Sequence, residues 1–560
     1  VLNAQPNHPD ANHNMGVLAV SVDKMQKALV YFKIALDANP SANQYWLSYI
    51  DALIRLGKLD DAKSLFNQAK DKGVKGEAFE QTEKPLSEFS AGEVQSQDPD
   101  PPSEQLQPII SLYTQGHLQQ ALSEISQMLE RFPNSAILYN IAGSSNVGLM
   151  QLDIAINSYK QALQIRPDFA EVYRNMGDAL KLNGDLEAAI DSYKKAVLIK
   201  PDFAVAYNSM GIALNDKGDL KEAIECYRWA ISLKTNDANA HYNLGNALKG
   251  MGDLDGAIDS YKQAVIAKPD YADAYQNMGV ALQNKGDLEA AINSYEQALI
   301  IKPNSFEAYN NMGVALHDKG DIDSAIGSYQ QAIKINPDFA EAYNNIGLSM
   351  RSKGDLEAAI DSYKKAIKIN PDYAEAYNNI GNALNDKGDI AAAIKSYEQA
   401  LKIKPGYAEA YNNMGNALND KGDLDAAIKS YEQALKIKPD YAEAYNNMGA
   451  ALQGRGDVEA AIDSLKKALK INPDYAEAHN NMGFSLNDKG DLDSAIDSYT
   501  KALKIKPDFV GVWNNLIFPL QAMKLQAPDI AELLSTINPK ASSKHVQIAK
   551  SVLSFSLYQG

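Results

Sequence analysis

A fixed period of 34 residues runs through most of this 560-residue chain. One unit spans Tyr407 to Asp440 and reads YAEAYNNMGNALNDKGDLDAAIKSYEQALKIKPD, and most of the remaining sequence consists of copies of it. Its proline recurs at multiples of the same spacing, at 167, 201, 269, 303, 337, 371, 405, 439, 473 and 507. A unit this short cannot bury a core alone, so the period predicts a solenoid of stacked helix-turn-helix units.

Each unit has the pattern of two short amphipathic helices. In the copy that starts at Ala374, apolar residues recur at helical spacing on both sides of the turn Lys387-Gly388-Asp389. Asp372 and Glu375 are spaced as a capping box for the first helix. Gly388 is predicted to end that helix in a left-handed conformation, and Asp389 to cap the second helix.

These residues resemble the tetratricopeptide repeat (TPR) family. The family signature is an aromatic residue, Leu-Gly, Ala, a second aromatic residue, Ala and Pro at fixed offsets. In the unit above these places are taken by Tyr411, Met414-Gly415, Ala427, Tyr431, Ala434 and Pro439. The resemblance covers most of the chain and implies an all-α fold, a right-handed TPR α-solenoid superhelix, whose first helices line an inner groove.

The regularity of the period divides the chain into four parts. Residues 1–76 form an N-terminal pair of repeats (9–42 and 43–76), and residues 77–101 are an acidic, proline-ended stretch with the composition of a flexible linker. Residues 102–509 hold one degenerate repeat and eleven regular ones. Residues 510–560 are expected to form a degenerate repeat, interrupted by Pro519, and a C-terminal capping helix at 542–558. The open alternative for this last segment is that it leads into a further domain.

Composition excludes several classes of partner. The chain has 54 Lys plus Arg against 71 Asp plus Glu, a net charge of −17, which argues against nucleic acid or an anionic membrane as a partner. No apolar stretch is long enough to span a bilayer. A single cysteine, Cys226, fits a reducing compartment, so we expect a cytoplasmic location. The chain starts at Val1 within a repeat, and we expect it to be a fragment or a processed form.

The sequence offers no candidate catalytic residue, metal ligand or cofactor site. His241 and His479 occupy the place that Tyr holds in other copies, which indicates a packing role. The stretch Gly143 to Gly148 superficially resembles a phosphate loop but lacks the Lys and Ser/Thr that such a loop requires. We therefore expect the chain not to be an enzyme and to need no cofactor or metal.

The candidate binding surface is the polar side of the first helices. An asparagine two residues before the first glycine recurs so regularly that it forms a ladder, and its amide suits pairing with a peptide backbone. This resembles the asparagine ladder in the TPR superhelix of O-GlcNAc transferases, which implies a peptide-binding groove. The alternative is that the asparagine has no binding role and recurs only because duplication of the repeat copied one solvated asparagine many times. The candidate groove residues are Asn175, Asn243, Asn277, Asn311, Asn345, Asn379, Asn413, Asn447, Asn481, Asn515, Asn382, Asn416, Glu375 and Glu409.

Acidic residues edge this surface, so we expect an extended protein segment that is neutral to basic. Changing Asn345, Asn379, Asn413 and Asn447 together to Ala is expected to weaken capture without lowering the melting temperature. Two alternatives remain open: a targeting arm of a larger enzyme, because similar arrays precede glycosyltransferase or sulfotransferase domains, and a self-assembling solenoid, because exposed ends permit homo-oligomerisation into rings or filaments.

Overall fold

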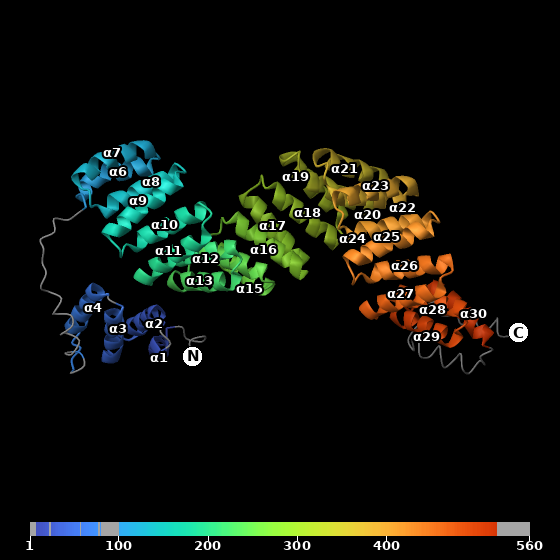
Figure 1. Cartoon of the computed structure of the whole chain (residues 1–560), viewed down its shortest axis with the longest axis horizontal. Helices are drawn as coiled ribbons and strands as arrows, with labels where there is room; N and C mark the ends of the chain where they lie inside the picture. The colour runs from blue at the N-terminus through green and yellow to red at the C-terminus, as the bar shows by residue number, and fades with distance from the viewer. Residues whose placement is uncertain (1–6, 22–23, 57, 77–78, 80–99, 524–560) are drawn as a thin grey trace. The chain divides into compact units, whose positions relative to one another are not determined.

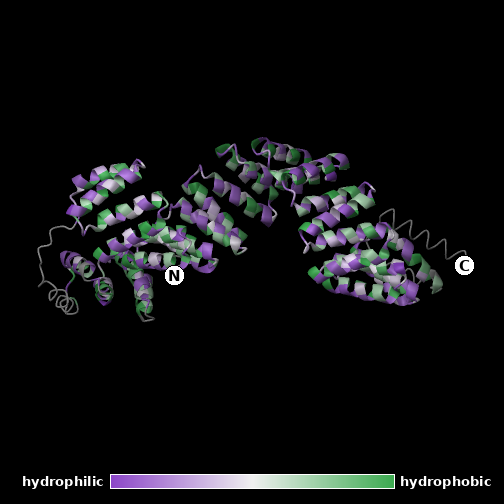
Figure 2. Ribbon diagram, turned by 45° about the horizontal axis from the view of Figure 1, so that its top comes forward, coloured by the Kyte–Doolittle hydropathy of each residue, from purple (hydrophilic) through white to green (hydrophobic). Residues whose placement is uncertain are grey.

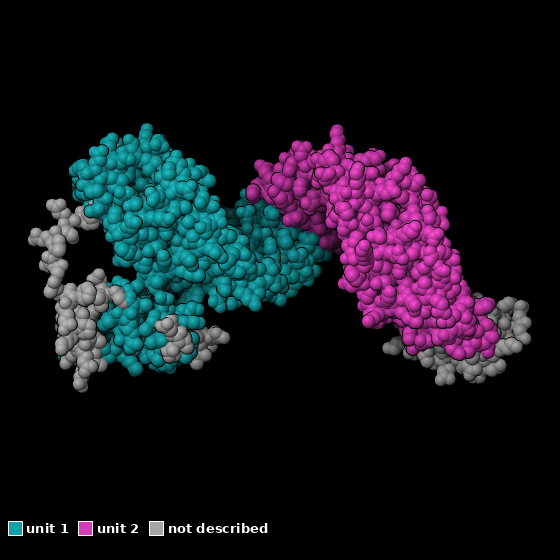
Figure 3. All heavy atoms as spheres, viewed as in Figure 1, with its two compact units in different colours: residues 1–301 teal, residues 302–560 magenta. Residues whose placement is uncertain are grey.

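The structure, a computed structural model, describes residues 7–21, 24–56, 58–76, 79 and 100–523. It divides into two compact units, residues 1–301 and 302–560, which are coloured separately in Figure 3. All regular secondary structure in the described part of the chain is helical (Figure 1). The prediction of an all-α fold is therefore confirmed.

Unit 1 begins with the N-terminal helices and continues into the main array. Its helices are α1 (Pro9–Ser21), α2 (Met25–Ala38), α3 (Asn43–Arg55), α4 (Leu59–Asp71), α6 (Ser103–Thr114), α7 (Leu118–Arg131), α8 (Ala136–Gly148), α9 (Leu152–Ile165), α10 (Ala170–Leu182), α11 (Leu186–Ile199), α12 (Ala204–Lys217), α13 (Leu220–Leu233), α14 (Ala238–Gly250), α15 (Leu254–Ala267), α16 (Ala272–Lys285) and α17 (Leu288–Ile301).

Unit 2 holds the rest of the array. Its helices are α18 (Phe306–Lys319), α19 (Ile322–Ile335), α20 (Ala340–Ser352), α21 (Leu356–Ile369), α22 (Ala374–Asp386), α23 (Ile390–Ile403), α24 (Ala408–Asp420), α25 (Leu424–Ile437), α26 (Ala442–Arg455), α27 (Val458–Ile471), α28 (Ala476–Lys489), α29 (Leu492–Ile505) and α30 (Val510–Ala522). In both units each helix of the array packs against the next one in sequence, which makes a solenoid of helix pairs. From α8 onward we call the even-numbered helices first helices and the odd-numbered ones second helices.

The turn inside each repeat forms as predicted. Gly388 follows α22 with a φ of 87°, a conformation that glycine adopts without the penalty of a Cβ. The Asp389 carboxylate then accepts a hydrogen bond from the backbone N–H of Ala392 at 3.1 Å and caps α23. The same glycine and aspartate recur in every repeat from α10 to α29, whereas between α8 and α9 Met150 takes the glycine position with a φ of 59° and Gln151 replaces the aspartate.

The predicted capping box of the first helix is wrong. The residue before the first turn of α22 is Tyr373, and no side chain caps that end of the helix. Asp372 lies one residue too early for the capping position, and its backbone N–H donates to Asn370 Oδ1 at 3.2 Å. The chain therefore enters the first helix from a turn held by Asn370.

A close contact between a glycine and a tyrosine joins the two helices in most repeats of the main array, and Leu465 replaces the tyrosine opposite Gly449. A Cβ placed on Gly415 of α24 would lie 2.5 Å from Cε1 of Tyr431 on α25, so only glycine fits against this ring. Ala427 and Ala434 of α25 are completely buried. The packing role predicted for these small residues is confirmed, and Figure 2 shows apolar and polar residues alternating along the helices of the array.

The prediction that Pro519 interrupts its helix is wrong. Helix α30 runs from Val510 to Ala522 with the proline inside it. Trp513, Leu516 and Leu520 of α30 are buried in one cluster with Tyr499 of α29. This packing holds the helical backbone on both sides of the proline. The predicted capping helix at 542–558 lies outside the described residues.

The linker, residues 77–101, also lies almost entirely outside the described residues, so its flexibility and the domain boundaries remain predictions. Within unit 1, Lys33 of α2 forms an ion pair with Asp202 at 3.4 Å, and both side chains are about half exposed. Ion pairs with this exposure contribute between zero and roughly 1 kcal/mol. This ion pair alone therefore does not fix the N-terminal repeats against the array.

Candidate functional site

The ladder asparagines lie on the first helices, where they hydrogen-bond to one another. In each case Nδ2 donates to Oδ1 of the asparagine that directly precedes the ladder position one repeat earlier, at 2.9–3.1 Å. The bonded pairs are Asn175 to Asn140, Asn243 to Asn208, Asn345 to Asn310, Asn379 to Asn344, Asn413 to Asn378, Asn447 to Asn412, Asn481 to Asn446 and Asn515 to Asn480. We call each of these bonds a rung.

Two ladder members differ from this pattern. Asn277 donates to the hydroxyl of Tyr242 at 2.9 Å and to Oδ1 of Asn246 at 3.0 Å, because a tyrosine takes the place of the acceptor asparagine. Asn311, on the first helix of unit 2, forms no rung within that unit. The rungs otherwise run along the first helices of both units, so the ladder connects successive repeats.

Five of the eight acceptor asparagines are more buried than the donors, and the other three, Asn140, Asn208 and Asn480, are half-buried like the donors. Asn310, Asn344, Asn378, Asn412 and Asn446 are no more than 6% exposed, whereas the ladder asparagines are half-buried. A buried amide oxygen must be hydrogen-bonded to avoid a large desolvation cost. The ladder therefore has a structural role that its recurrence alone did not reveal, and replacing its members with alanine is expected to reduce stability.

Asn382 and Asn416, both candidate groove residues, are held by tyrosines. The hydroxyl of Tyr397 donates to Asn382 Oδ1 at 2.8 Å, and that of Tyr431 donates to Asn416 Oδ1 at 2.7 Å. These two tyrosine rings are buried, and burial raises the pKa of their hydroxyls. The hydroxyls remain protonated donors at neutral pH and fix the amide oxygens of their partners.

Several acids at the edge of the first helices are already ion-paired. Glu375 accepts a hydrogen bond from Nζ of Lys404 at 2.7 Å, which holds its pKa below the usual value against the effect of partial burial. Lys404 also lies over the Tyr407 ring, 4.6 Å from its centroid. Glu409 is exposed, with no such partner among the described residues. The negative charge of the surface is therefore smaller than the sequence indicated.

Positive side chains on the first helices are paired too. Arg351 of α20 donates to Asp386 of α22 at 2.6 Å, and this hydrogen bond raises the arginine's pKa. A partner carboxylate would have to compete with Asp386 for this guanidinium.

Neither metal-binding clusters nor a long apolar helix occur in the part of the chain that the structure describes. Its His, Cys, Asp and Glu side chains form no group of metal-ligand type, and none of its helices is long and apolar enough to cross a membrane. His241 and His479 pair through Nε2 with the carbonyl oxygens of Thr235 and Pro473, each at 2.9 Å. Residues 143–148 are helical, the end of α8, and form no phosphate loop.

Profiles of known families match both the N-terminal and the main array. A profile described as "TPR repeat" matches residues 151–184, 177–217, 211–252, 246–286, 284–320, 315–351, 349–385, 381–419, 415–456 and 454–487. Two profiles described as "Tetratricopeptide repeat" match residues 476–509 and 14–74. This chain belongs to the tetratricopeptide repeat family. The family predicted from the signature residues is thereby confirmed.

Solved structures similar to this TPR chain include that of MamA, 32% identical, covering 30% of this chain and 97% of that chain with a TM-score of 0.28. Another is that of YrrB, described as a TPR protein with an unusual peptide-binding site, which is 25% identical, covers 33% of this chain and 96% of its own, and has a TM-score of 0.31. Yeast Tom70 is 17% identical over 71% of this chain and 98% of its own, with a TM-score of 0.38. No curated protein matches this TPR chain.

Sequence reasoning missed the acceptor half of every rung. The predicted ladder contains only the asparagine nearer the glycine, although the unit contains two adjacent asparagines, as in Asn412 and Asn413. The doubled asparagine was the available signal: two amides in succession on one helix supply a donor toward one neighbouring repeat and an acceptor toward the other.

Proposed function

We propose that this TPR chain is a non-catalytic scaffold that binds an extended protein segment along its first helices. The observation that supports this most directly is the hydrogen-bonding capacity left over by the rungs. Asn345, Asn379 and Asn413 each use one amide N–H in a rung, while no described residue donates to their Oδ1 atoms. Each therefore retains one acceptor and one N–H donor on a half-buried side chain.

The spacing of these amides suits an extended backbone. Packed helices lie about 8–10 Å apart, and an extended peptide advances about 3.3 Å per residue. One asparagine per repeat would therefore meet roughly every third residue of the bound segment. Because a backbone amide pairs with any asparagine amide, this arrangement provides affinity with little dependence on the ligand's sequence.

Charge then favours some segments over others. Glu409 and Asp420, at opposite ends of α24, are exposed and have no ion pair among the described residues. Arg351, a positive residue of the first helix α20, is already paired with Asp386. Neutral and basic segments are therefore the proposed ligands of this surface.

The test reverses the charge of two acidic residues that take part in no rung. A phage-displayed random dodecapeptide library is selected on the intact chain, and the recovered peptides are measured by fluorescence anisotropy. We expect these peptides to be enriched in Lys and Arg. Glu409→Lys combined with Asp420→Lys is expected to weaken them about tenfold, which corresponds to ~1.4 kcal/mol.

The matched control carries the same change of charge on the second helices. Glu398 and Glu432 are exposed on α23 and α25, and Glu398→Lys with Glu432→Lys is expected to change affinity by less than about twofold, since remote surface charges are screened by salt. Equal effects of the two double variants would overturn the proposed location, and recovery of no binding peptide would overturn the proposed function.

A further inference from the structure

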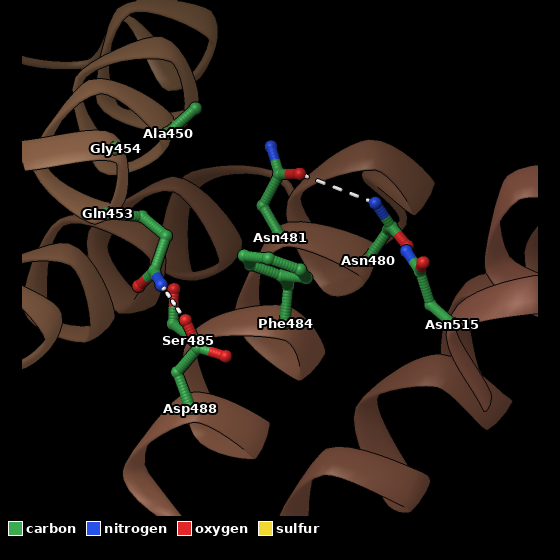
Figure 4. Close-up of a pocket in the computed structure, with 9 residues that line it drawn as sticks. All are labelled: Ala450, Gln453, Gly454, Asn480, Asn481, Phe484, Ser485, Asp488 and Asn515. Carbon is green, nitrogen blue, oxygen red and sulfur yellow. Dashed lines mark hydrogen bonds between the residues drawn. The ribbon is translucent and has the colours of Figure 1, made fainter. Parts of the chain in front are cut away.

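A hollow opens on the first helices near the end of unit 2. Its volume is 390 Å³, and it lies between α26, α28 and α30. Figure 4 shows the Phe484 ring in the middle of the surrounding polar side chains. Its lining residues are Ala450, Gln453, Gly454, Asn480, Asn481, Phe484, Ser485, Asp488 and Asn515. We call this hollow the Phe484 socket.

The socket exists where three residues differ from their counterparts in α24. Where α24 carries Asn416 and Asp420, α26 carries Ala450 and Gly454, which leave space. The position of Asn416 is taken in α28 by Phe484, whose side chain is 44% exposed. Small residues, Ala450 and Gly454, therefore line one side of the hollow, and the apolar ring of Phe484 forms its base.

Two buried polar atoms in the socket have no partner. Ser485 is completely buried, and neither its Oγ nor Oε1 of Gln453 forms a hydrogen bond in the structure. At the equivalent positions four repeats earlier, Nδ1 of His317 lies 2.9 Å from Oγ of Ser349, so that pair satisfies itself. In the socket the Gln453 amide donates to Asp488 instead. Most buried polar groups in proteins are hydrogen-bonded, so these two atoms set the socket apart from the pair at 317 and 349.

We propose that the Phe484 socket is an anchor for one large apolar side chain of a partner protein's extended segment, with a basic residue beside it. This inference rests on the proposed function and adds to it the chemistry of the ligand. The apolar side chain packs on Phe484 and fills the space beside Ala450 and Gly454. A Lys or Arg beside the anchor faces Asp488, the one charged side chain of the lining.

The size and the charge of the socket support this occupant. Ligand pockets in proteins have volumes of roughly 300–1,000 Å³ and combine apolar walls with a few polar groups, and 390 Å³ falls at the lower end of that range. Large apolar anchors inserted in pockets dominate the affinity of many protein interfaces. Asp488 carries the only charge in the lining and disfavours an acidic segment.

Two substitutions alter the socket, one by filling it and one by removing its aromatic ring. Each introduces a residue that stands at the equivalent position of another repeat. Gly454→Asp introduces the side chain found at 420, and a Cβ at Gly454 would approach nothing closer than 3.5 Å. Phe484→Asn introduces the residue found at 416, where Asn416 accepts a hydrogen bond from the repeat's buried tyrosine. Both variants are therefore expected to fold with an unchanged melting temperature.

The control is Gly327→Asp on the second helix α19. A Cβ at Gly327 has nothing within 4 Å, and the equivalent residue one repeat later is Asp361. This variant makes the same chemical change as Gly454→Asp but on a different helix face. Any difference between the two therefore reports on the socket.

The probes are the dodecapeptides selected from the random library on the intact chain. We expect a shared large apolar residue next to Lys or Arg, and affinities that fall about tenfold in Gly454→Asp and in Phe484→Asn but less than about twofold in Gly327→Asp. Replacing the apolar residue of the peptide with Ala is expected to cause no further loss in Phe484→Asn, as expected for two groups in direct contact.

Four outcomes would overturn the anchor. Peptides weakened by Glu409→Lys with Asp420→Lys, yet indifferent to Gly454→Asp and Phe484→Asn, would leave the scaffold function standing and remove the socket from it. Self-association abolished by Gly454→Asp, seen by analytical ultracentrifugation, would assign the socket to a second copy of the chain. Displacement of the peptides by a synthetic peptide of residues 542–558 would assign it to the chain itself. If no dodecapeptide binds, both proposals fail.

Discussion

Nδ2 of Asn413 donates a hydrogen bond to Oδ1 of Asn378, 3.1 Å away, although the two asparagines belong to different repeats. Asn378 is only 5% exposed, so Asn413→Ala would leave its amide oxygen buried and without this donor. We expect this change to lower the free energy of unfolding by about 1–3 kcal/mol. Urea denaturation followed by circular dichroism measures it.

The control for that rung is Asn284→Ala. Asn284 is an exposed residue of the first helix α16, and its replacement is expected to change stability by no more than about 0.5 kcal/mol. Equal midpoints for the wild type and Asn413→Ala would show that the rung contributes nothing. The expectation drawn from sequence, that the ladder could be changed to alanine without lowering the melting temperature, is thus replaced by the opposite one.

A second prediction compares two glycines of one repeat. A Cβ on Gly313 would lie 2.5 Å from the ring of Tyr329, whereas a Cβ on Gly327 would meet nothing within 4 Å. Gly313→Ala is therefore expected to destabilise the chain by about 1–3 kcal/mol through overpacking. Gly327→Ala is expected to stabilise it by about 0.5–1 kcal/mol through helix propensity. Thermal melts of the two variants that shift in the same direction would contradict this account of the helix contact.

A third prediction concerns alkaline pH. Burial raises the pKa of Tyr159 to about 12 and also raises that of its counterparts Tyr193, Tyr261 and Tyr431. Between pH 10 and 12 the unfolded chain loses these protons while the folded chain keeps them, so the free energy of unfolding falls as pH rises. Each buried tyrosine contributes about 1.4 kcal/mol for each pH unit between its two pKa values.

Urea denaturation at several pH values above 9 measures this loss. Tyr159→Phe removes one titrating group, so its stability is expected to fall less steeply with pH than that of the wild type. Parallel pH profiles for the two proteins would show that Tyr159 does not contribute to alkaline unfolding.

A fourth prediction concerns the single thiol. Cys226 lies on α13, is 7% exposed, and burial raises its pKa to about 12. We expect N-ethylmaleimide to leave the folded chain unmodified at pH 8 and to modify it rapidly in concentrated urea, as mass spectrometry would show. Equal rates under both conditions would place the thiol at the surface. The resistance follows from burial and from the scarcity of thiolate, since the thiolate is the reacting form.

The regular features of the fold followed from the sequence because each depends on residues within one repeat. Gly388 and Asp389 act at a turn a few residues long, and Gly415 meets Tyr431 inside a single helix pair. The capping residue predicted from the sequence is off by one position, because Tyr373 rather than Asp372 directly precedes the helix. Helix boundaries assigned by different criteria differ by one or two residues. Pro519 was misjudged because packing against Tyr499 outweighs local propensity.

The rungs and the socket could not be predicted because they depend on the alignment of neighbouring repeats. Asn413 reaches Asn378 rather than Asn379, and that choice is set by the axial offset between two first helices, which the period does not specify. The Phe484 socket exists because the small residues Ala450 and Gly454 leave space unfilled. Departures from a repeat pattern mark such positions, but only the structure shows that they face one another.

The rungs also affect how the number of repeats in such a chain can change during evolution. In unit 2 each repeat offers a donor asparagine on one side and an acceptor asparagine on the other, as Asn412 and Asn413 do. Removing or duplicating one whole unit brings a donor of one copy opposite an acceptor of another, so the network closes again. Unequal recombination between these near-identical copies can therefore lengthen or shorten the array in single steps, each of which yields a foldable protein.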